Sequence, residues 1–140
     1  MKYLLAISRA FAIGALTTAP TLAWSQQKAV AQSPSVTGTW SGSVTQAGSA
    51  KAYSLVLKVR AKDGETDYPE LSCGGRLTRV GSSSGYTFFI ETITRGRQDQ
   101  GGRCIDGSIT IAPAGDQLAW GWVGSHQGKT LIAYSTLMRK

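Results

Sequence analysis

The two cysteines, Cys73 and Cys104, are the residues whose type and number point most directly to a chemistry. In an oxidising compartment, an even number of cysteines in a small domain usually forms disulfides. Closing a loop of about 32 residues stabilises a fold by roughly 3–4 kcal/mol. A metal site is the alternative, but the chain has a single histidine, His126, and no further ligand at a metal-like spacing. The sequence therefore predicts a Cys73–Cys104 disulfide, with neither a metal nor a cofactor.

Glu91 is the acidic residue of most chemical interest. If Phe89 and Ile93 face the core, Glu91 faces it as well, and a buried carboxylate needs a partner. Arg76 and Arg103 both lie near a cysteine in the sequence and are the candidate partners. The favoured interpretation is a buried ion pair beside the disulfide, and the alternative makes Glu91 a polar anchor inside a ligand pocket.

Three arginines, Arg95, Arg97 and Arg103, fall within one polar segment, residues 95–103. Guanidinium groups gathered on a loop could clamp a carboxylate or a phosphate. The segment contains no aromatic residues on which bases could stack, so no nucleic-acid partner is predicted. An anionic small molecule is the kind of partner that this segment favours.

Three tryptophans, Trp40, Trp120 and Trp122, would line the interior of the domain if their strands turn the same face inward. Core filling is the favoured role, although an open barrel mouth would also allow them to contact a ligand. The candidate ligand-binding residues are therefore Trp40, Arg76, Glu91, Arg95, Arg97, Arg103, Trp120 and Trp122.

The patterns that could indicate catalysis have simpler interpretations. The segment 81–85, Gly-Ser-Ser-Ser-Gly, matches a nucleophile elbow, but that motif requires a strand leading into a helix. Here it joins two β segments. His126 lies in a Gly-containing turn with no carboxylate nearby in the sequence to fix its tautomer. The sequence therefore predicts that the chain is not an enzyme and has no catalytic residues.

The N-terminal 25 residues are typical of a signal peptide. Lys2 and Arg9 supply positive charge, and the apolar segment 10–23 is too short to span a bilayer as a helix. We expect export to the periplasm or the medium, and no stable membrane insertion after cleavage.

Small residues allow cleavage after Ala23, Ser25 or Ala31, and Ser25 is favoured because a polar stretch follows it. The expected organisation is a signal peptide over 1–25, a flexible lead-in over 26–36 and one domain over 37–140. Removal of the signal peptide would leave 13 basic residues against 8 acidic ones, a net charge of +5. This charge suits an anionic partner such as a glycan, although solubility alone is the favoured explanation.

After residue 37 the chain alternates apolar and polar residues between Gly-containing turns. Segment 52–60 is the clearest strand, with its apolar residues on one face. Residues 62–65 are expected to form a hairpin turn around Asp63-Gly64, and Gly74-Gly75 to form a bulge or a close backbone approach. Segment 86–94 has apolar residues on both faces, so its inward face is not fixed. The pattern predicts seven or eight strands in a small antiparallel up-and-down β-barrel, with a β-sandwich as the alternative.

Four local signatures resemble one known domain. They are Gly38-Thr39-Trp40-Ser41-Gly42, the stretch from Tyr68-Pro69 through Cys73-Gly74-Gly75-Arg76-Leu77, Glu91-Thr92-Ile93-Thr94-Arg95-Gly96, and Arg103-Cys104 with Gly107. Together they are similar to the extracytoplasmic C-terminal β-domain of some bacterial serine/threonine protein kinases, which also occurs as free-standing secreted proteins. The resemblance covers about residues 37–122. It implies that the two cysteines pair and that the chain is a sensor or binding module without an assigned ligand.

These observations favour a non-enzymatic, exported binding or sensor-like domain of the bacterial envelope. A protein-interaction or inhibitor module of the cell envelope is the alternative. A small secreted hydrolase is a further alternative that the residues support least.

Overall fold

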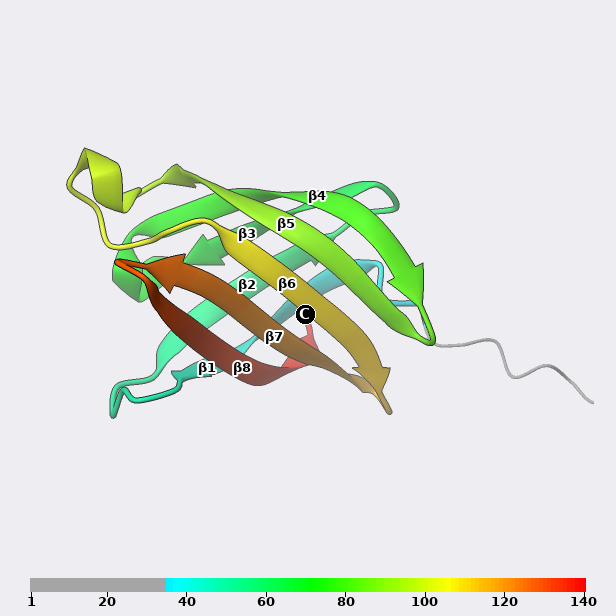
Figure 1. Cartoon of the computed structure of the whole chain (residues 1–140). Coiled ribbons are helices and arrows are strands. Elements are labelled where there is room, and N and C mark those ends of the chain that lie inside the picture. The colour runs from blue at the N-terminus through cyan, green and yellow to red at the C-terminus, as the bar shows by residue number, and fades with distance from the viewer. Residues whose placement is uncertain (1–34) are drawn as a thin grey trace, which may run out of the picture. The chain divides into compact units, whose positions relative to one another are not determined.

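Eight antiparallel strands close into a barrel in the computed structural model, which describes residues 35–140 (Figure 1). The predicted signal peptide and all but the last two residues of the predicted lead-in lie outside the described residues. The elements in chain order are β1 (Gly38–Gln46), β2 (Tyr53–Val59), β3 (Asp63–Tyr68), the 3-10 helix η1 (Pro69–Leu71), β4 (Cys73–Ser83), β5 (Tyr86–Arg95), the 3-10 helix η2 (Gln98–Gln100), β6 (Gly107–Ala114), β7 (Gln117–His126) and β8 (Lys129–Arg139). The predicted antiparallel up-and-down barrel is confirmed. Among residues 35–140, neither helix has the length and apolar character that crossing a membrane requires.

Alternation of side chains along each strand fills the interior. In β2, Leu55, Leu57 and Val59 are buried while Lys58 is exposed, as the sequence predicts. In β5 the buried residues are Thr87, Phe89, Glu91 and Ile93, so the odd-numbered face points inward. Glu91 is therefore carried into the barrel by its apolar neighbours.

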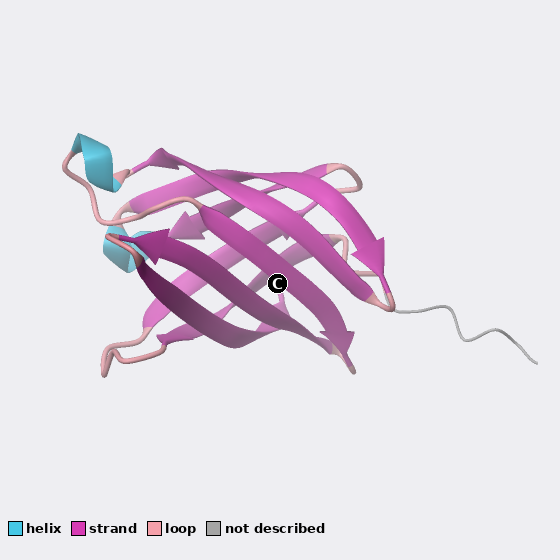
Figure 2. Cartoon of the chain, in the orientation of Figure 1, coloured by secondary structure: helices cyan, strands magenta, loops and turns pink. Residues whose placement is uncertain are grey.

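Each strand pairs with the next one, and β8 returns to pair with β1 (Figure 2). The closing ladder joins Trp40 to Arg139 at one end and Gln46 to Ala133 at the other. Between these pairs, the Ser135 hydroxyl donates to the Ser43 carbonyl oxygen at 2.7 Å. Closure leaves the sheet without a free edge strand.

The turn predicted over residues 62–65 is wrong, because Asp63, Gly64 and Glu65 belong to β3. The chain reverses before these residues, where the Arg60 amide donates to the Asp63 carbonyl oxygen at 2.8 Å, and β3 already starts at Asp63. Gly64 is buried, and a Cβ there would lie 2.5 Å from the Lys58 carbonyl oxygen and 3.1 Å from Leu77. The glycine serves close strand packing rather than a hairpin turn. The predicted irregularity at Gly74-Gly75 is confirmed, since the β4–β5 register shifts there.

The two ends of the barrel differ in how they are closed. At the end near the start of β1, Trp40 is buried and its indole N–H donates to the Val36 carbonyl oxygen at 2.8 Å. The Arg139 guanidinium covers this ring at 4.2 Å from its centroid. We call this the plugged end. The opposite end carries the connections 47–52, 69–72, 96–106 and 127–128, and lies at the left in Figure 1. We call it the loop end.

Candidate functional site

A cavity of about 120 Å³ lies at the loop end of the barrel. Its walls come from the ends of several strands and from the segment that leads into β6. The polar and aromatic residues that line it are Gln46, Tyr53, Tyr68, Glu91, Arg103 and Trp122. The remaining walls are Leu71, Ile93, Leu131 and the Cys104–Ile105 segment. The fold thus leaves a hollow with polar and apolar walls at the loop end of the barrel.

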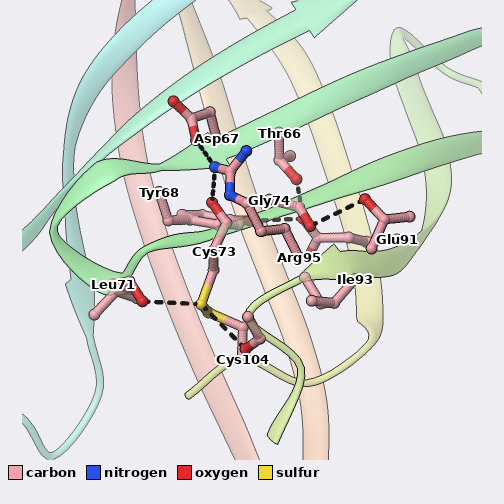
Figure 3. The surroundings of a disulfide bond; sticks show 12 residues. Thr66, Asp67, Tyr68, Leu71, Cys73, Gly74, Glu91, Ile93, Arg95 and Cys104 are labelled. Carbon is pink, nitrogen blue, oxygen red and sulfur yellow. Dashed lines mark hydrogen bonds and ion pairs between the residues drawn. A yellow bond between two sulfur atoms is a disulfide. The ribbon is translucent and has the colours of Figure 1, made fainter. Parts of the chain in front are cut away.

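Glu91 is the carboxylate that lines this cavity, although the residue is only 1% exposed. Its Oε1 accepts hydrogen bonds from the Thr66 hydroxyl and, at 2.9 Å, from the Tyr68 hydroxyl (Figure 3). Its Oε2 accepts the indole N–H of Trp122 at 2.8 Å. Three donors from β3 and β7 therefore hold one carboxylate on β5.

The predicted ion pair between Glu91 and Arg76 or Arg103 is wrong. Within residues 35–140, every hydrogen bond to the Glu91 carboxylate comes from a neutral donor. Arg76 follows Gly75 and precedes Leu77, both buried, so strand alternation places it on the outer surface. Arg103 lines the same cavity as Glu91 but forms no hydrogen bond with it.

Burial dominates the electrostatics of this group. Desolvation raises the pKa of the Glu91 carboxyl, and the three hydrogen bonds oppose that shift. Burial, reinforced by the neighbouring Glu91, raises the pKa of Tyr68 well above its ordinary value. Tyr68 therefore stays protonated and keeps its role as a donor to the carboxylate.

Two glycines let the donors reach Glu91 across an intervening strand. Gly75 on β4 stands between Thr66 and β5, and a Cβ there would lie 3.1 Å from both the Thr66 hydroxyl and Cγ of Glu91. Gly107 on β6 pairs with Glu91, and a Cβ there would lie 2.7 Å from Cζ2 of Trp122. Because these two glycines have no side chains, Thr66 and Trp122 have room to reach the Glu91 carboxylate.

Gly124 on β7 also leaves space for the Trp122 ring. A Cβ at Gly124 would lie 2.6 Å from Cζ2 of the indole. We expect Gly124→Ala to displace the ring from Glu91 and to lower the free energy of unfolding by about 1–3 kcal/mol, as overpacking does. Urea unfolding followed by tryptophan fluorescence measures both the loss and the altered indole environment.

Gly121→Ala on the same strand is the matched control, because nothing lies within 4 Å of a Cβ at that position. It should change the free energy of unfolding by less than about 0.5 kcal/mol. Equal effects of the two substitutions would contradict the positioning role of Gly124.

The structure separates the three arginines that the sequence places in one segment. Arg95 pairs with Asp67 and also donates to the Cys73 carbonyl oxygen at 2.8 Å (Figure 3). Arg97 is held by Asp99 at 3.0 Å and by Asp106 at 2.9 Å. Only Arg103 of the three lines the cavity. They therefore do not form one shared clamp.

The structure places Trp40, Trp120 and Trp122 in different surroundings. Trp40 at the plugged end and Trp120 are buried in the apolar core, the predicted core role. Trp122 is partly buried and lines the cavity. The tryptophans do not surround a common void, and Trp122 is the one placed to contact a ligand.

Four residues of the site are not among the site residues predicted from the sequence. Tyr53 begins β2 and lines the cavity. Thr66 and Tyr68 belong to β3, a strand that the sequence does not predict, and both point inward. Gln46 ends β1 at the cavity. The alternation of Gly64, Thr66 and Tyr68 is the signal that could have identified β3.

The Cys73–Cys104 disulfide is confirmed, and its Cys104 lines the cavity. It ties the 96–106 connection to the start of β4 (Figure 3). The amides of Arg103 and Cys104 both donate to the Gly96 carbonyl oxygen at 3.0 Å. This local turn and the disulfide together fix Arg103 at the rim.

The residues considered for catalysis lie apart. Ser83 ends β4, and Ser84-Gly85 form the turn into β5 at the plugged end. His126 ends β7 at the loop end, where its Nε2 is 3.4 Å from the Gln98 amide. The Gly-Ser-Ser-Ser-Gly segment joins two strands and lacks the strand-to-helix geometry of a nucleophile elbow.

Comparison with known proteins gives no match. No protein-family model, no curated protein and no solved structure is significantly similar to the chain. The resemblance to the kinase-linked extracytoplasmic domain stays a prediction, and functional inference depends on the site itself.

Proposed function

We propose that this chain is a non-enzymatic, exported binding domain of the bacterial envelope whose ligand occupies the cavity at the loop end. The observation that carries the proposal is the buried Glu91, which lines a cavity and is bonded only by neutral donors within residues 35–140. A buried charge without a counter-charge costs stability. Recognition of a ligand is a function that offsets such a cost. Export rests on the signal-peptide pattern of residues 1–25.

The environment of Glu91 supports a binding role over a merely structural one. A carboxylate offers about four lone-pair positions for hydrogen bonds. Two donors occupy Oε1 and one occupies Oε2. One acceptor position therefore remains on the oxygen nearest Trp122, in a cavity lined largely by aromatic and apolar side chains. A few polar groups among apolar walls are characteristic of small-molecule sites.

A thermal-shift screen against small envelope metabolites, glycan fragments and lipid headgroups tests the proposal. A ligand present at 100 times its dissociation constant should stabilise the native state by about 2.7 kcal/mol. Ligand binding should also change the tryptophan emission spectrum, because Trp122 lines the cavity. The spectral change should persist in Trp40→Phe, which alters only the plugged end.

Two neighbouring residues on β8 give matched variants for locating the ligand. Leu131 lines the cavity, whereas Ile132 is 47% exposed on the outer surface. Leu131→Trp should fill the cavity and abolish the melting shift, while Ile132→Asp should leave it unchanged. The reverse pattern, or a full shift in Leu131→Trp, would contradict binding in the cavity.

A protein-interaction module is the second candidate, and the outer face of β5–β8 favours it. Ile90, Val123 and Ile132 are each about half exposed. The registers align them in one row across the sheet, interrupted by Ser108. Phe88 and Tyr134 lie in the neighbouring row. Loss of a partner in Ile132→Asp but not in Leu131→Trp would support this candidate.

A further inference from the structure

We propose that the ligand of the cavity is a small zwitterion whose ammonium group binds Glu91 and whose carboxylate binds Arg103. This inference rests on the proposed binding function and specifies the chemistry of the ligand. It follows from the charges that line the cavity, from the free hydrogen-bonding positions and from the size of the cavity.

Glu91 calls for a positively charged hydrogen-bond donor. The residue is 1% exposed, and its carboxylate receives three neutral donors and keeps one acceptor position on Oε2. Water-poor surroundings strengthen an ion pair once both charges are inside them. The aromatic residues Tyr53, Tyr68 and Trp122 line the same cavity. Aromatic rings stabilise a nearby ammonium group.

Arg103 supplies the opposite charge at the rim. Within residues 35–140, the ion pairs involve Arg60, Arg95 and Arg97, and Arg103 takes part in none. The side chain of Arg103 is exposed yet lines the cavity, and its backbone is fixed next to the disulfide. A guanidinium with its donors free is well suited to bind a carboxylate in a bidentate manner.

The pair of charges discriminates between ligand classes. A simple anion would meet Arg103 favourably but would be repelled by Glu91 deeper in the cavity. A simple amine would meet Glu91 favourably but would leave Arg103 unmatched. A molecule with an ammonium group at one end and a carboxylate at the other satisfies both residues.

The volume of the cavity accommodates only a few heavy atoms of a ligand. The volume is about 120 Å³, and cavities of about 150 Å³ in other proteins hold a molecule the size of benzene. Simple amino acids without large side chains fall in this range. Glycine, β-alanine and 4-aminobutanoate differ only in the separation of their two charges, which makes them a graded set of probes.

Isothermal titration calorimetry on the purified, disulfide-intact chain tests the inference with six probes. The three zwitterions are compared with propylamine, propionate and propionamide. We expect one zwitterion to bind at least tenfold more tightly than the three singly charged or neutral probes. Arg103→Gln should reduce its affinity to that of propylamine, and Glu91→Gln should reduce it to that of propionate.

Arg76→Gln is the matched control, because Arg76 is exposed on the outer surface of β4. It should leave zwitterion affinity unchanged. Arg103→Gln alters an exposed side chain and should fold normally, so the test does not depend on the folding of the Glu91 variant. A zwitterion affinity unaffected by Arg103→Gln would overturn the assignment of the carboxylate.

The probes also separate failure of this inference from failure of the proposed function. Tight binding of propionamide or propionate, abolished by Leu131→Trp, would overturn the zwitterion inference and retain a cavity-binding domain. Failure of these probes and of the wider thermal-shift screen to bind in the cavity would overturn both.

Discussion

Replacing both Cys73 and Cys104 by serine is expected to lower the free energy of unfolding by about 3–4 kcal/mol. The disulfide joins residues 31 positions apart, and the chain between them includes most of β4, all of β5 and η2. Without it, the unfolded chain regains the conformational freedom of that loop. The change should appear as a lower urea midpoint of the double variant relative to the oxidised wild type.

The same double substitution should weaken ligand binding in the cavity as well as the stability of the fold. Cys104 is part of the cavity wall, and the disulfide holds the connection that carries Arg103. Any ligand that uses Arg103 should therefore bind the double variant less tightly, even at temperatures where it stays folded. The reduced wild-type protein is the control and should match the double variant. Equal urea midpoints for oxidised and reduced protein would contradict the stabilising role of this disulfide.

Glu91→Gln is expected to lower the free energy of unfolding at neutral pH by about 1–3 kcal/mol, the usual effect of leaving a buried polar group unpaired. The glutamine carbonyl can accept hydrogen bonds from Thr66 and Tyr68, as Oε1 does now. Its amide group would then face the indole N–H of Trp122, which donates to Oε2 in the wild type. Two hydrogen-bond donors, the glutamine amide and the indole N–H, would then face each other inside the barrel.

The size of this effect should depend on pH in a definite direction. Burial raises the pKa of Glu91 above its ordinary value of 4.5, so the native state takes up a proton before the unfolded state does. Wild-type stability from this group therefore increases as the pH falls from the folded pKa toward 4.5. Each unit of difference between the two pKa values contributes about 1.4 kcal/mol. The variant lacks this contribution.

The measurement is urea unfolding of the wild type and Glu91→Gln at a series of pH values. The difference between the two proteins isolates Glu91, because three exposed carboxylates, Glu65, Glu70 and Asp99, have lowered pKa values and favour higher pH in both. The deficit of the variant should grow on acidification. A constant deficit across this pH range would show that Glu91 has the same pKa folded and unfolded.

A double-mutant cycle separates the Trp122 contact from the rest of the effect. In a chain that already carries Trp122→Phe, the indole donor is absent. Glu91→Gln should then cost less than it does in the wild type, since no donor faces the new amide. An unchanged cost would place the penalty elsewhere in the site.

The alternation of apolar residues predicts most of the barrel, and its failures have physical causes. Segment 52–60 is clear because one face is buried and the other is charged. Segment 86–94 is ambiguous because Phe88 and Ile90, on the outer face, are as apolar as its core residues. The strand β3 is not predicted, because Asp-Gly is also a common turn pair, and only the packing of Gly64 against β2 and β4 reveals its strand position.

The site is predicted less completely than the fold. Glu91 emerges from the sequence as a buried carboxylate once the face of β5 is known. Its partners do not, because Thr66 and Trp122 come from strands that are not adjacent to β5 and reach it over glycines. Sequence proximity to the cysteines suggested arginine partners instead. A hydrogen bond that crosses an intervening strand at a glycine depends on how the strands pack in three dimensions. The residue pattern of a single strand does not encode this packing.

The closing seam between β1 and β8 has a consequence for how the barrel forms. Every other strand pair joins consecutive segments, whereas this ladder pairs Trp40 with Arg139 and Gln46 with Ala133 across most of the chain. Local hairpins can form early, while closure requires a long loop to be ordered first. Backbone pairing along the seam is also interrupted between Ser41 and Thr45. The amides of this ladder should therefore acquire protection from hydrogen exchange last during refolding, making closure the slow step of assembly.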